Sequence, residues 1–281
     1  MSWDFAYDSP IAIKALLQAH GLNLTKKFGQ NFLLSRPAVA TLAQAAAKAS
    51  KVWEIGPGIG TLTKALLDRG ANVTAFEIDH GFCRILREEA FADEKGFELV
   101  EGDFLKTFDE YYRTHGAPDC LCANLPYNVG SICIAKVLEA GCHAPVMEFT
   151  LQKEVADRLC AMPGTDMWGS LSVLVQADYA ARPLMKIPGS CFFPPPNVDS
   201  QAILLTRLDK SQVDKADREV FLSLNRTLFA QRRKTIANNL KARFENVEQR
   251  LREAGIEPSR RAETLSVSEI AAMAKAFRQH A

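Results

Sequence analysis

The chain has 281 residues and a mass of 31.0 kDa, and with 47% hydrophobic and 24% charged residues it can bury the core of one large domain or two ordinary ones. This composition excludes a collagen-like, coiled-coil or wholly disordered chain, and a net charge of +1 argues against a protein that grips nucleic acid by charge over its whole surface. The sequence contains no apolar run of roughly 18 residues and no signal-peptide pattern at its N-terminus, so we expect neither a membrane span nor secretion.

From residue 51 onward, short apolar runs alternate with stretches of helical spacing. The expected strands are 51–55, 72–77, 97–101, 119–123 and 145–151, and the expected helices are 61–69, 80–90, 132–140 and 153–160. This alternation predicts an α/β fold with a mostly parallel sheet covered on both faces. Two further expected strands, 171–178 and 201–208, lack a helix between them and predict an antiparallel pair at one edge. The Pro194–Pro196 run would form a rigid bend between them.

The pattern changes after residue 208, where only helical spacing remains, over 213–229, 232–244, 247–254 and 267–277. Ser266 and Glu269 form a capping-box pattern before the last of these helices. We therefore expect two domains, 1–208 and 209–281. Residues 208–281 hold 15 Lys and Arg against 10 Asp and Glu, a net charge of +5. Such a basic module suggests contact with a polyanion, although a solvated helical surface explains the charge equally well.

The seven cysteines are odd in number and scattered, without C-x-x-C spacing, and the five histidines form no cluster. We therefore expect free thiols, no metal site, and a location in the reducing cytoplasm.

A glycine turn follows the first strand of the predicted sheet, at Gly56-Pro57-Gly58-Ile59-Gly60. Glycines there let a ligand approach the backbone closely. Glu77 ends the second strand, where a carboxylate can accept hydrogen bonds from both hydroxyls of an adenosine ribose. The G-x-G-x-x-G pattern is not met, and Pro57 removes an N–H from the turn, so the pattern favours a nucleoside with a short charged tail, such as S-adenosylmethionine, over a dinucleotide.

Asp103 follows the third strand and faces the same ligand crevice. Its carboxylate can accept a hydrogen bond from an adenine amine, or it can simply cap the following loop.

The tetrapeptide Asn124-Leu125-Pro126-Tyr127 follows the fourth strand and is the most informative segment. An exocyclic adenine amine is a poor nucleophile because its lone pair is delocalised into the ring. The Asn124 side-chain oxygen and the Leu125 carbonyl, directed by Pro126, can accept hydrogen bonds from the two N–H groups of this amine and so localise the lone pair. Tyr127 offers an aromatic face to the base. We predict methyl transfer to such an amine, achieved mainly by positioning.

These motifs together resemble the bacterial small-subunit (16S) ribosomal RNA adenine dimethyltransferases, the kasugamycin-sensitivity methyltransferase family. The resemblance runs from Lys26 to Phe277 and is carried by Lys27–Leu33, Glu54–Gly60, Phe76–Asp79, Glu101–Asp103, Asn124–Asn128, Gln152–Ala156, Pro163-Gly164, Leu171–Val173, Val198–Ser200, Gln231–Thr235 and Gly255-Ile256. The sequence departs from the family at Asn197, where lysine is usual, and at Trp168, where tyrosine is usual.

The resemblance implies a Rossmann-like S-adenosylmethionine-dependent methyltransferase domain, preceded by an N-terminal helical segment, and a small all-helical C-terminal domain that binds RNA. It implies donor contacts at Asn31, Leu33, Gly56, Glu77, Asp103 and Asn124, with Gln30 close by. The substrate adenine would lie at Asn124, Leu125, Pro126 and Tyr127, with Phe193 a second stacking face. The implied partner is 16S rRNA in the small ribosomal subunit or its precursor, and we expect a monomer.

Gln231–Lys234 and Arg260-Arg261 become candidate phosphate contacts on this interpretation. Two alternatives stay open. The chain could be a 23S rRNA adenine methyltransferase that confers macrolide resistance, although those tend to be more basic. It could also be a non-catalytic assembly factor that retained the fold.

Overall fold

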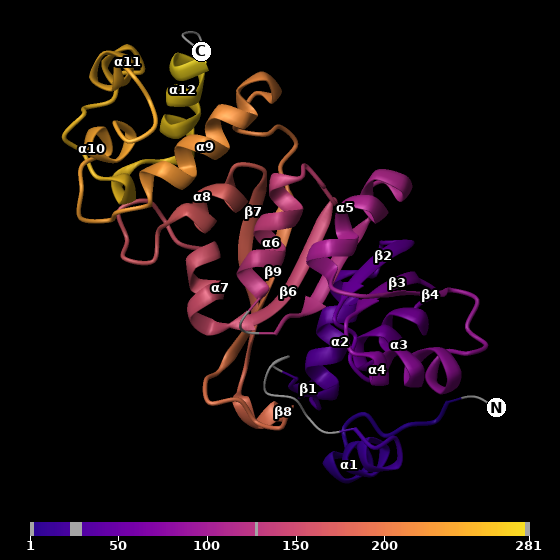
Figure 1. Cartoon of the computed structure of the whole chain (residues 1–281). Helices are drawn as coiled ribbons and strands as arrows, with labels where there is room; N and C mark the ends of the chain where they lie inside the picture. Colours follow the sequence, from indigo (N-terminus) through magenta and orange to yellow (C-terminus); the bar gives the residue numbers. More distant parts are fainter. Residues whose placement is uncertain (1–2, 23–29, 127–128, 279–281) are drawn as a thin grey trace. The chain divides into compact units, whose positions relative to one another are not determined.

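The computed structural model describes residues 3–22, 30–126 and 129–278, and the chain divides into two compact units (Figure 1). The first unit comprises residues 1–156 and 182–206, and the second comprises residues 157–181 and 207–281. The second unit is therefore larger than the C-terminal domain expected from the sequence, because residues 157–181 pack with the C-terminal helices.

The first unit contains a seven-stranded sheet and a two-stranded sheet. The strands of the two sheets are β1 (Phe32–Leu33), β2 (Lys51–Ile55), β3 (Asn72–Glu77), β4 (Phe97–Glu101), β5 (Cys120–Asn124), β6 (Val146–Gln152), β7 (Tyr179–Ile187), β8 (Phe192–Phe193) and β9 (Ser200–Arg207). The helices are α1 (Pro10–Ala19), α2 (Arg36–Ala45), α3 (Thr61–Leu67), α4 (His80–Ile85), which continues as a π-helical turn (Leu86–Ala90), α5 (Phe104–His115), α6 (Gly130–Glu139), α7 (Lys153–Leu159), which continues into the second unit, and a 3₁₀ turn (Gly189–Cys191).

The large sheet has the strand order β4-β3-β2-β5-β6-β9-β7. The first five strands are parallel to one another, and β9 runs antiparallel to β6. The chain order reverses between β2 and β5, which is the point where a parallel sheet leaves a crevice at the carboxyl ends of its strands. The predicted α/β architecture is confirmed, and this crevice is the natural position for a ligand.

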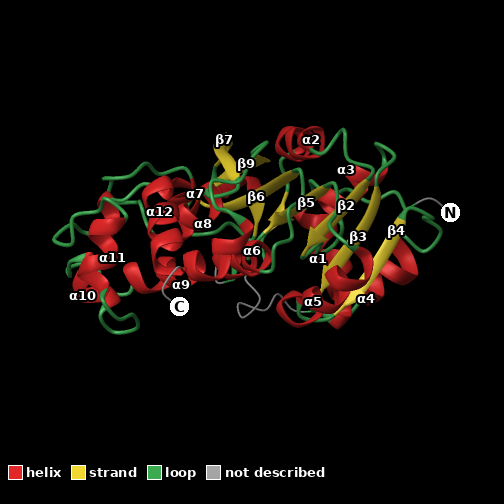
Figure 2. Cartoon of the chain, turned by 90° about the horizontal axis from the view of Figure 1, so that it is seen from above, coloured by secondary structure: helices red, strands yellow, loops and turns green. Residues whose placement is uncertain are grey.

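Helices cover both faces of the parallel strands (Figure 2). On one face, Val52 and Cys122 pack with Leu42 of α2 and Leu66 of α3 in one buried cluster. On the opposite face, α5 contributes aromatic rings that pack edge-on against the buried Trp53 and Phe76. Both faces are buried because each parallel strand needs helices on both sides.

Some sequence-based assignments differ from the structure. Residues 171–178 were expected to form a strand, but they lie in helix α8 (Ser170–Gln176), and the edge strand is β7 instead. Because Ser172–Val175 are all buried, this segment shows neither the alternation of a strand nor the spacing of an amphipathic helix. Its residue types alone therefore do not distinguish a buried strand from a buried helix. The sequence analysis also missed α5, which Asp103 begins by capping the Leu105 N–H at 3.0 Å.

The second unit is helical apart from the first residues of β7. Its helices are α8, α9 (Arg218–Leu228), α10 (Ile236–Leu240), α11 (Val247–Glu253) and α12 (Val267–Arg278), with 3₁₀ turns at Lys215–Asp217 and Ala262–Thr264. Helix α10 is much shorter than the expected 232–244, because Gln231–Lys234 form a turn that Thr235 ends by capping α10. The predicted capping box is confirmed, since the Glu269 N–H donates to Ser266 Oγ at 3.2 Å and the Ser266 N–H donates to Glu269 Oε2 at 2.8 Å.

Over the part of the chain that the structure describes, none of the helices combines the length and the hydropathy that spanning a bilayer requires.

Candidate active site

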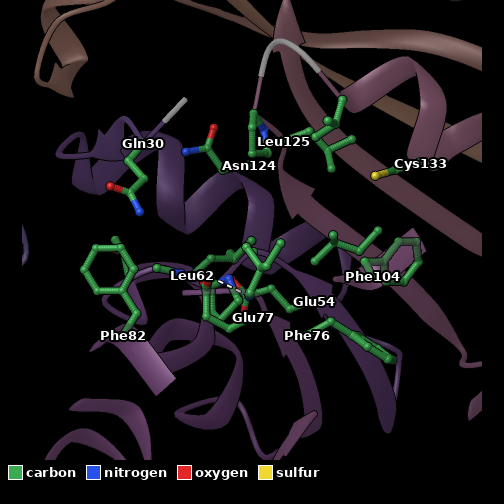
Figure 3. A pocket seen from close by; sticks show the side chains of 18 of the residues that line it. Gln30, Glu54, Leu62, Phe76, Glu77, Phe82, Phe104, Asn124, Leu125 and Cys133 are labelled. Atoms are coloured by element: carbon green, nitrogen blue, oxygen red, sulfur yellow. Dashed lines mark hydrogen bonds between the residues drawn. The ribbon is translucent and has the colours of Figure 1, made fainter. Parts of the chain in front are cut away.

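The carboxyl ends of β2, β3, β4 and β5 open into one cavity of about 360 Å³ in the first unit (Figure 3). Parallel pairing brings these ends together, with Ile55 beside Phe76 and Glu77 beside Glu101. The cavity is lined by Asn31, Leu33, Gly56, Glu77, Asp103, Asn124, Leu125 and Pro126, eight of the nine residues expected from the sequence. The ninth, Tyr127, lies outside the described residues.

The glycine turn is held by its own backbone and by packing behind it. The Gly56 N–H donates to the Phe76 carbonyl at 2.9 Å, and the Gly60 N–H donates to the Pro57 carbonyl at 2.9 Å. Gly60 has φ of +88°, and a β-carbon there would lie 2.6 Å from the ring of Phe91. The turn therefore requires glycine at this position for both conformation and space, and it sets the direction in which α3 leaves the cavity.

Glu77 is buried at the cavity wall and is fixed by three backbone donors. Its Oε1 accepts from the N–H groups of Ile78 and Asp79 at 2.8 and 2.9 Å, and its Oε2 accepts from the Gly58 N–H at 3.0 Å. Burial raises the pKa of Glu77 to about 7 against the opposing effect of these bonds. A carboxylate has about four acceptor positions, so Glu77 keeps capacity for a ligand hydroxyl.

Glu54 lines the same cavity and was given no role in the sequence analysis. It is buried and accepts a hydrogen bond from Thr63 Oγ1 at 2.6 Å. Burial raises its pKa to about 7, and the charge of Glu77 adds to the effect. Its position next to the last residue of β2, two residues before the first glycine of the turn, was the signal that could have identified it.

Asp103 performs the capping role that the sequence left open, and its position on the cavity wall leaves the role as a ligand acceptor a prediction. It caps α5 through Oδ1, and its side chain also lines the cavity. Phe104, the next residue, is buried against Phe76 and forms part of the apolar wall. The cavity thus combines carboxylates with apolar and aromatic surface, which suits a nucleoside that has hydroxyl donors and a flat ring.

Asn124 lies at the end of β5, and its amide has a defined orientation. Its Nδ2 donates to the backbone carbonyl of Asn31 at 2.9 Å. Because the nitrogen is used in this way, the side-chain oxygen is the atom left to accept a hydrogen bond from a ligand. Leu125 is anchored beside it, since its N–H donates to the Thr150 carbonyl at 3.2 Å.

One other predicted contact lies elsewhere. Phe193 is not one of the cavity-lining residues; it packs with Phe32 and Ile13, and Lys14 Nζ lies 5.4 Å from its ring centroid. Sequence reasoning also did not assign Cys133, whose side chain is buried at the cavity wall. A lone cysteine in a helical pattern carries no signal for such a position. Among the described residues, no group of three or more His, Cys, Asp or Glu side chains is placed to hold a metal ion.

Comparison with known proteins gives consistent results. The family model described as ribosomal RNA adenine dimethylase matches residues 21–279. The chain is 41% identical to ribosomal RNA small subunit methyltransferase A of Treponema denticola, covering 83% of this chain and 80% of that protein. It is 39% identical to the protein of the same name from Lactococcus lactis, covering 95% and 94%.

Two solved structures resemble this one over most of its length. The 23S rRNA methyltransferase ErmE is 25% identical with a TM-score of 0.63, and the match covers 87% of this chain and 98% of that one. A dimethyladenosine transferase from Plasmodium falciparum has a TM-score of 0.70 over 86% of this chain and 95% of that one, and at 23% identity it supports the fold alone.

The parallel sheet, the glycine turn and the converging Glu77, Asp103 and Asn124 define an S-adenosylmethionine-dependent methyltransferase. The chain belongs to the ribosomal RNA adenine dimethylase family, and it is an rRNA adenine dimethyltransferase.

Proposed function

We propose that this enzyme dimethylates the exocyclic amines of two adjacent adenosines in the 3′-terminal hairpin loop of 16S rRNA, in the small ribosomal subunit or its precursor. The observation that carries the proposal is the oriented Asn124 amide, which lies in the same cavity as Glu77 and Asp103. The curated relatives at 39–41% identity are named as small-subunit methyltransferases, which supports this substrate over 23S rRNA.

In this proposal, Asn31, Leu33, Gly56, Glu77, Asp103 and Asn124 hold the donor. Glu77 accepts a hydrogen bond from a ribose hydroxyl, and Asp103 accepts from the adenine amine. Because Glu77 is already fixed by three backbone donors, it binds without reorganising. S-Adenosylmethionine supplies a methyl group activated by its positively charged sulfur.

Asn124, Leu125, Pro126 and Tyr127 position the target adenine. The Asn124 oxygen and the Leu125 carbonyl accept hydrogen bonds from the two N–H groups of the amine, so the nitrogen lone pair is directed into the cavity. Because the target must leave its base stack to reach this position, Tyr127 provides the face on which it stacks. Catalysis by such positioning requires that the accepting atoms be fixed beforehand, and the hydrogen bond to the Asn31 carbonyl does this for Asn124.

We further propose that the C-terminal domain, 209–281, contacts RNA phosphates. Arg233, Lys234 and Arg261 are exposed. A β-bridge between Thr235 and Arg261 brings the segment that follows Lys234 next to Arg261. Arg260 does not belong to this set, because its guanidinium donates to Thr264 and Glu269. Glutamate substitutions at Arg233 and Lys234 are expected to weaken RNA binding and reduce its salt dependence, with donor affinity unchanged.

The test of the function is mass spectrometry of 16S rRNA after small subunits are incubated with the protein and S-adenosylmethionine. Two adjacent dimethyladenosines near the 3′ end are the expected product. Methylation of 23S rRNA instead would support the macrolide-resistance alternative, and donor binding without methylation of either RNA would support a non-catalytic assembly factor. We also propose that the protein acts as a monomer in the cytoplasm, and size-exclusion chromatography with light scattering tests its oligomeric state.

A further inference from the structure

Residues 30–33, here called the strap, form one wall of the donor cavity, and all four line it. The strap is attached at three points in the first unit. Gln30 Nε2 donates to Asp79 Oδ2 at 3.0 Å, the Asn31 carbonyl accepts from Asn124 Nδ2 at 2.9 Å, and the strand β1 within the strap pairs with β8. Gln30, at one end of the strap, therefore contacts the turn that follows β3, and Asn31 contacts the last residue of β5.

Asp79 connects the Gln30 end of the strap to Glu77. Its Oδ1 caps α4 by accepting from the Gly81 N–H at 2.9 Å and the Phe82 N–H at 3.3 Å. Its own N–H donates to Glu77 Oε1 at 2.9 Å. The oxygen that Gln30 uses, Oδ2, is thus carried by a residue that both starts α4 and holds the ribose-binding carboxylate in place.

The second attachment, the hydrogen bond from Asn124 Nδ2 to the Asn31 carbonyl, fixes the side chain that we propose contacts the target amine. The Asn31 carbonyl decides which way the Asn124 amide faces, because an amide turned by 180° would place its oxygen against that carbonyl. A shift of the strap therefore alters donor contacts and frees the Asn124 amide at the same time. Figure 3 shows Gln30 and Asn124 on the same side of the cavity, with Glu77 deeper inside it.

We propose that the Gln30–Asp79 hydrogen bond is a positioning contact that holds the strap against the donor cavity and thereby couples donor binding to the orientation of the Asn124 amide. This inference rests on the donor and acceptor roles proposed above for Glu77 and Asn124. Gln30 acts here through the strap, so it is a positioning residue rather than a catalytic one.

Gln30→Ala is the first test. Losing this hydrogen bond between an amide and a carboxylate is expected to raise the dissociation constant for S-adenosylmethionine by about tenfold or more in calorimetry. Because the Asn124 amide is then less well fixed, kcat at saturating donor is expected to fall by about threefold or more. Gln18→Ala, at an exposed glutamine on α1, is the matched control and is expected to change neither value.

Exchanging the hydrogen-bond donor and acceptor between residues 30 and 79 distinguishes a positioning role of Gln30 from a general effect on folding stability. Gln30→Glu places a carboxylate against that of Asp79 and is expected to weaken donor binding more than Gln30→Ala. Asp79→Asn retains an oxygen to cap α4 and gains an amide donor. The double variant Q30E/D79N therefore restores the hydrogen bond with its direction reversed, and its donor affinity is expected to return to within about twofold of the wild type.

The outcomes test the positioning role of Gln30 and its coupling to Asn124 separately. Donor affinity of Gln30→Ala equal to wild type, or no recovery in the double variant, overturns the positioning role. Weaker donor binding with kcat unchanged overturns the coupling to Asn124. Wild-type protein that binds no donor would instead show that the proposed function itself is wrong, so the two failures are distinguishable.

Discussion

Replacing Asn124 by alanine removes two interactions of different kinds. One is the hydrogen bond from Nδ2 to the Asn31 carbonyl, which stabilises the strap beside the donor. The other is the side-chain oxygen that we propose accepts a hydrogen bond from an N–H of the target amine. Only the second is made with the reacting nitrogen, so the substitution is expected to reduce turnover far more than donor binding.

The two magnitudes follow from these contacts. Loss of a neutral hydrogen bond costs about 0.5–1.5 kcal/mol, which corresponds to a donor dissociation constant about two- to twelvefold higher. Loss of a preorganised group that acts on developing charge costs about 2.7–4 kcal/mol, or about 10²–10³ in kcat. The gap between the two effects identifies Asn124 as a group that acts in the transition state.

Calorimetry with S-adenosylmethionine and mass spectrometry of methylated 16S rRNA measure the two effects separately. Asn238→Ala, at an exposed asparagine in the second unit, is the control and is expected to leave both unchanged. Normal dimethylation by the Asn124 variant would refute the assignment of the acceptor. An equal loss of donor affinity and turnover would show that Asn124 serves only the donor.

Three further outcomes are expected. Donor affinity should fall by up to about tenfold when the pH is lowered from 8 to 6, because burial raises the pKa of Glu77 to about 7 and ribose hydroxyls bind its ionised form; affinity that is flat across this range in calorimetry would contradict the role of Glu77. Glu148→Leu should raise the free energy of unfolding by about 1–3 kcal/mol, because Glu148 is fully buried and neither carboxyl oxygen has a hydrogen-bond partner among the residues that the structure describes. Burial, together with the charge of Glu54, raises the pKa of Glu148 in the folded protein well above its usual range. The unfolded chain therefore releases this proton at lower pH than the folded protein does, and the wild type becomes less stable as the pH rises. The gain in stability of Glu148→Leu in urea unfolding should thus be larger at pH 8 than at pH 6, and a smaller gain at pH 8 would count against this account. Ser266→Ala should lower the stability of the second unit by about 1 kcal/mol in thermal unfolding, because it removes the cap on the Glu269 N–H, and an unchanged melting temperature would show that the cap contributes nothing.

The sequence predicted the strands that build the site because their pattern is local. Gly56 follows a short run rich in apolar residues, Glu77 ends the next such run, and Asn124 ends a third, so each could be placed at a strand end without knowledge of the fold. Helix α8 could not be assigned in this way. Val173 packs in the core of the second unit, and Ser172, Leu174 and Val175 are also buried, so this run of the sequence shows no exposed polar face to mark the helical period.

Contacts between distant residues were decided only by the tertiary structure. The orientation of the Asn124 amide depends on a carbonyl 93 positions earlier in the chain, and the Gln30–Asp79 pair joins residues 49 positions apart. Likewise, the pKa values of Glu54 and Glu77 are raised by burial that the residue letters do not show. The sequence by itself determined which chemical groups stand at the strand ends, because strand periodicity and turn chemistry are local; how those groups are oriented, desolvated and linked is set by packing between segments far apart in the chain, and only the folded structure could decide it.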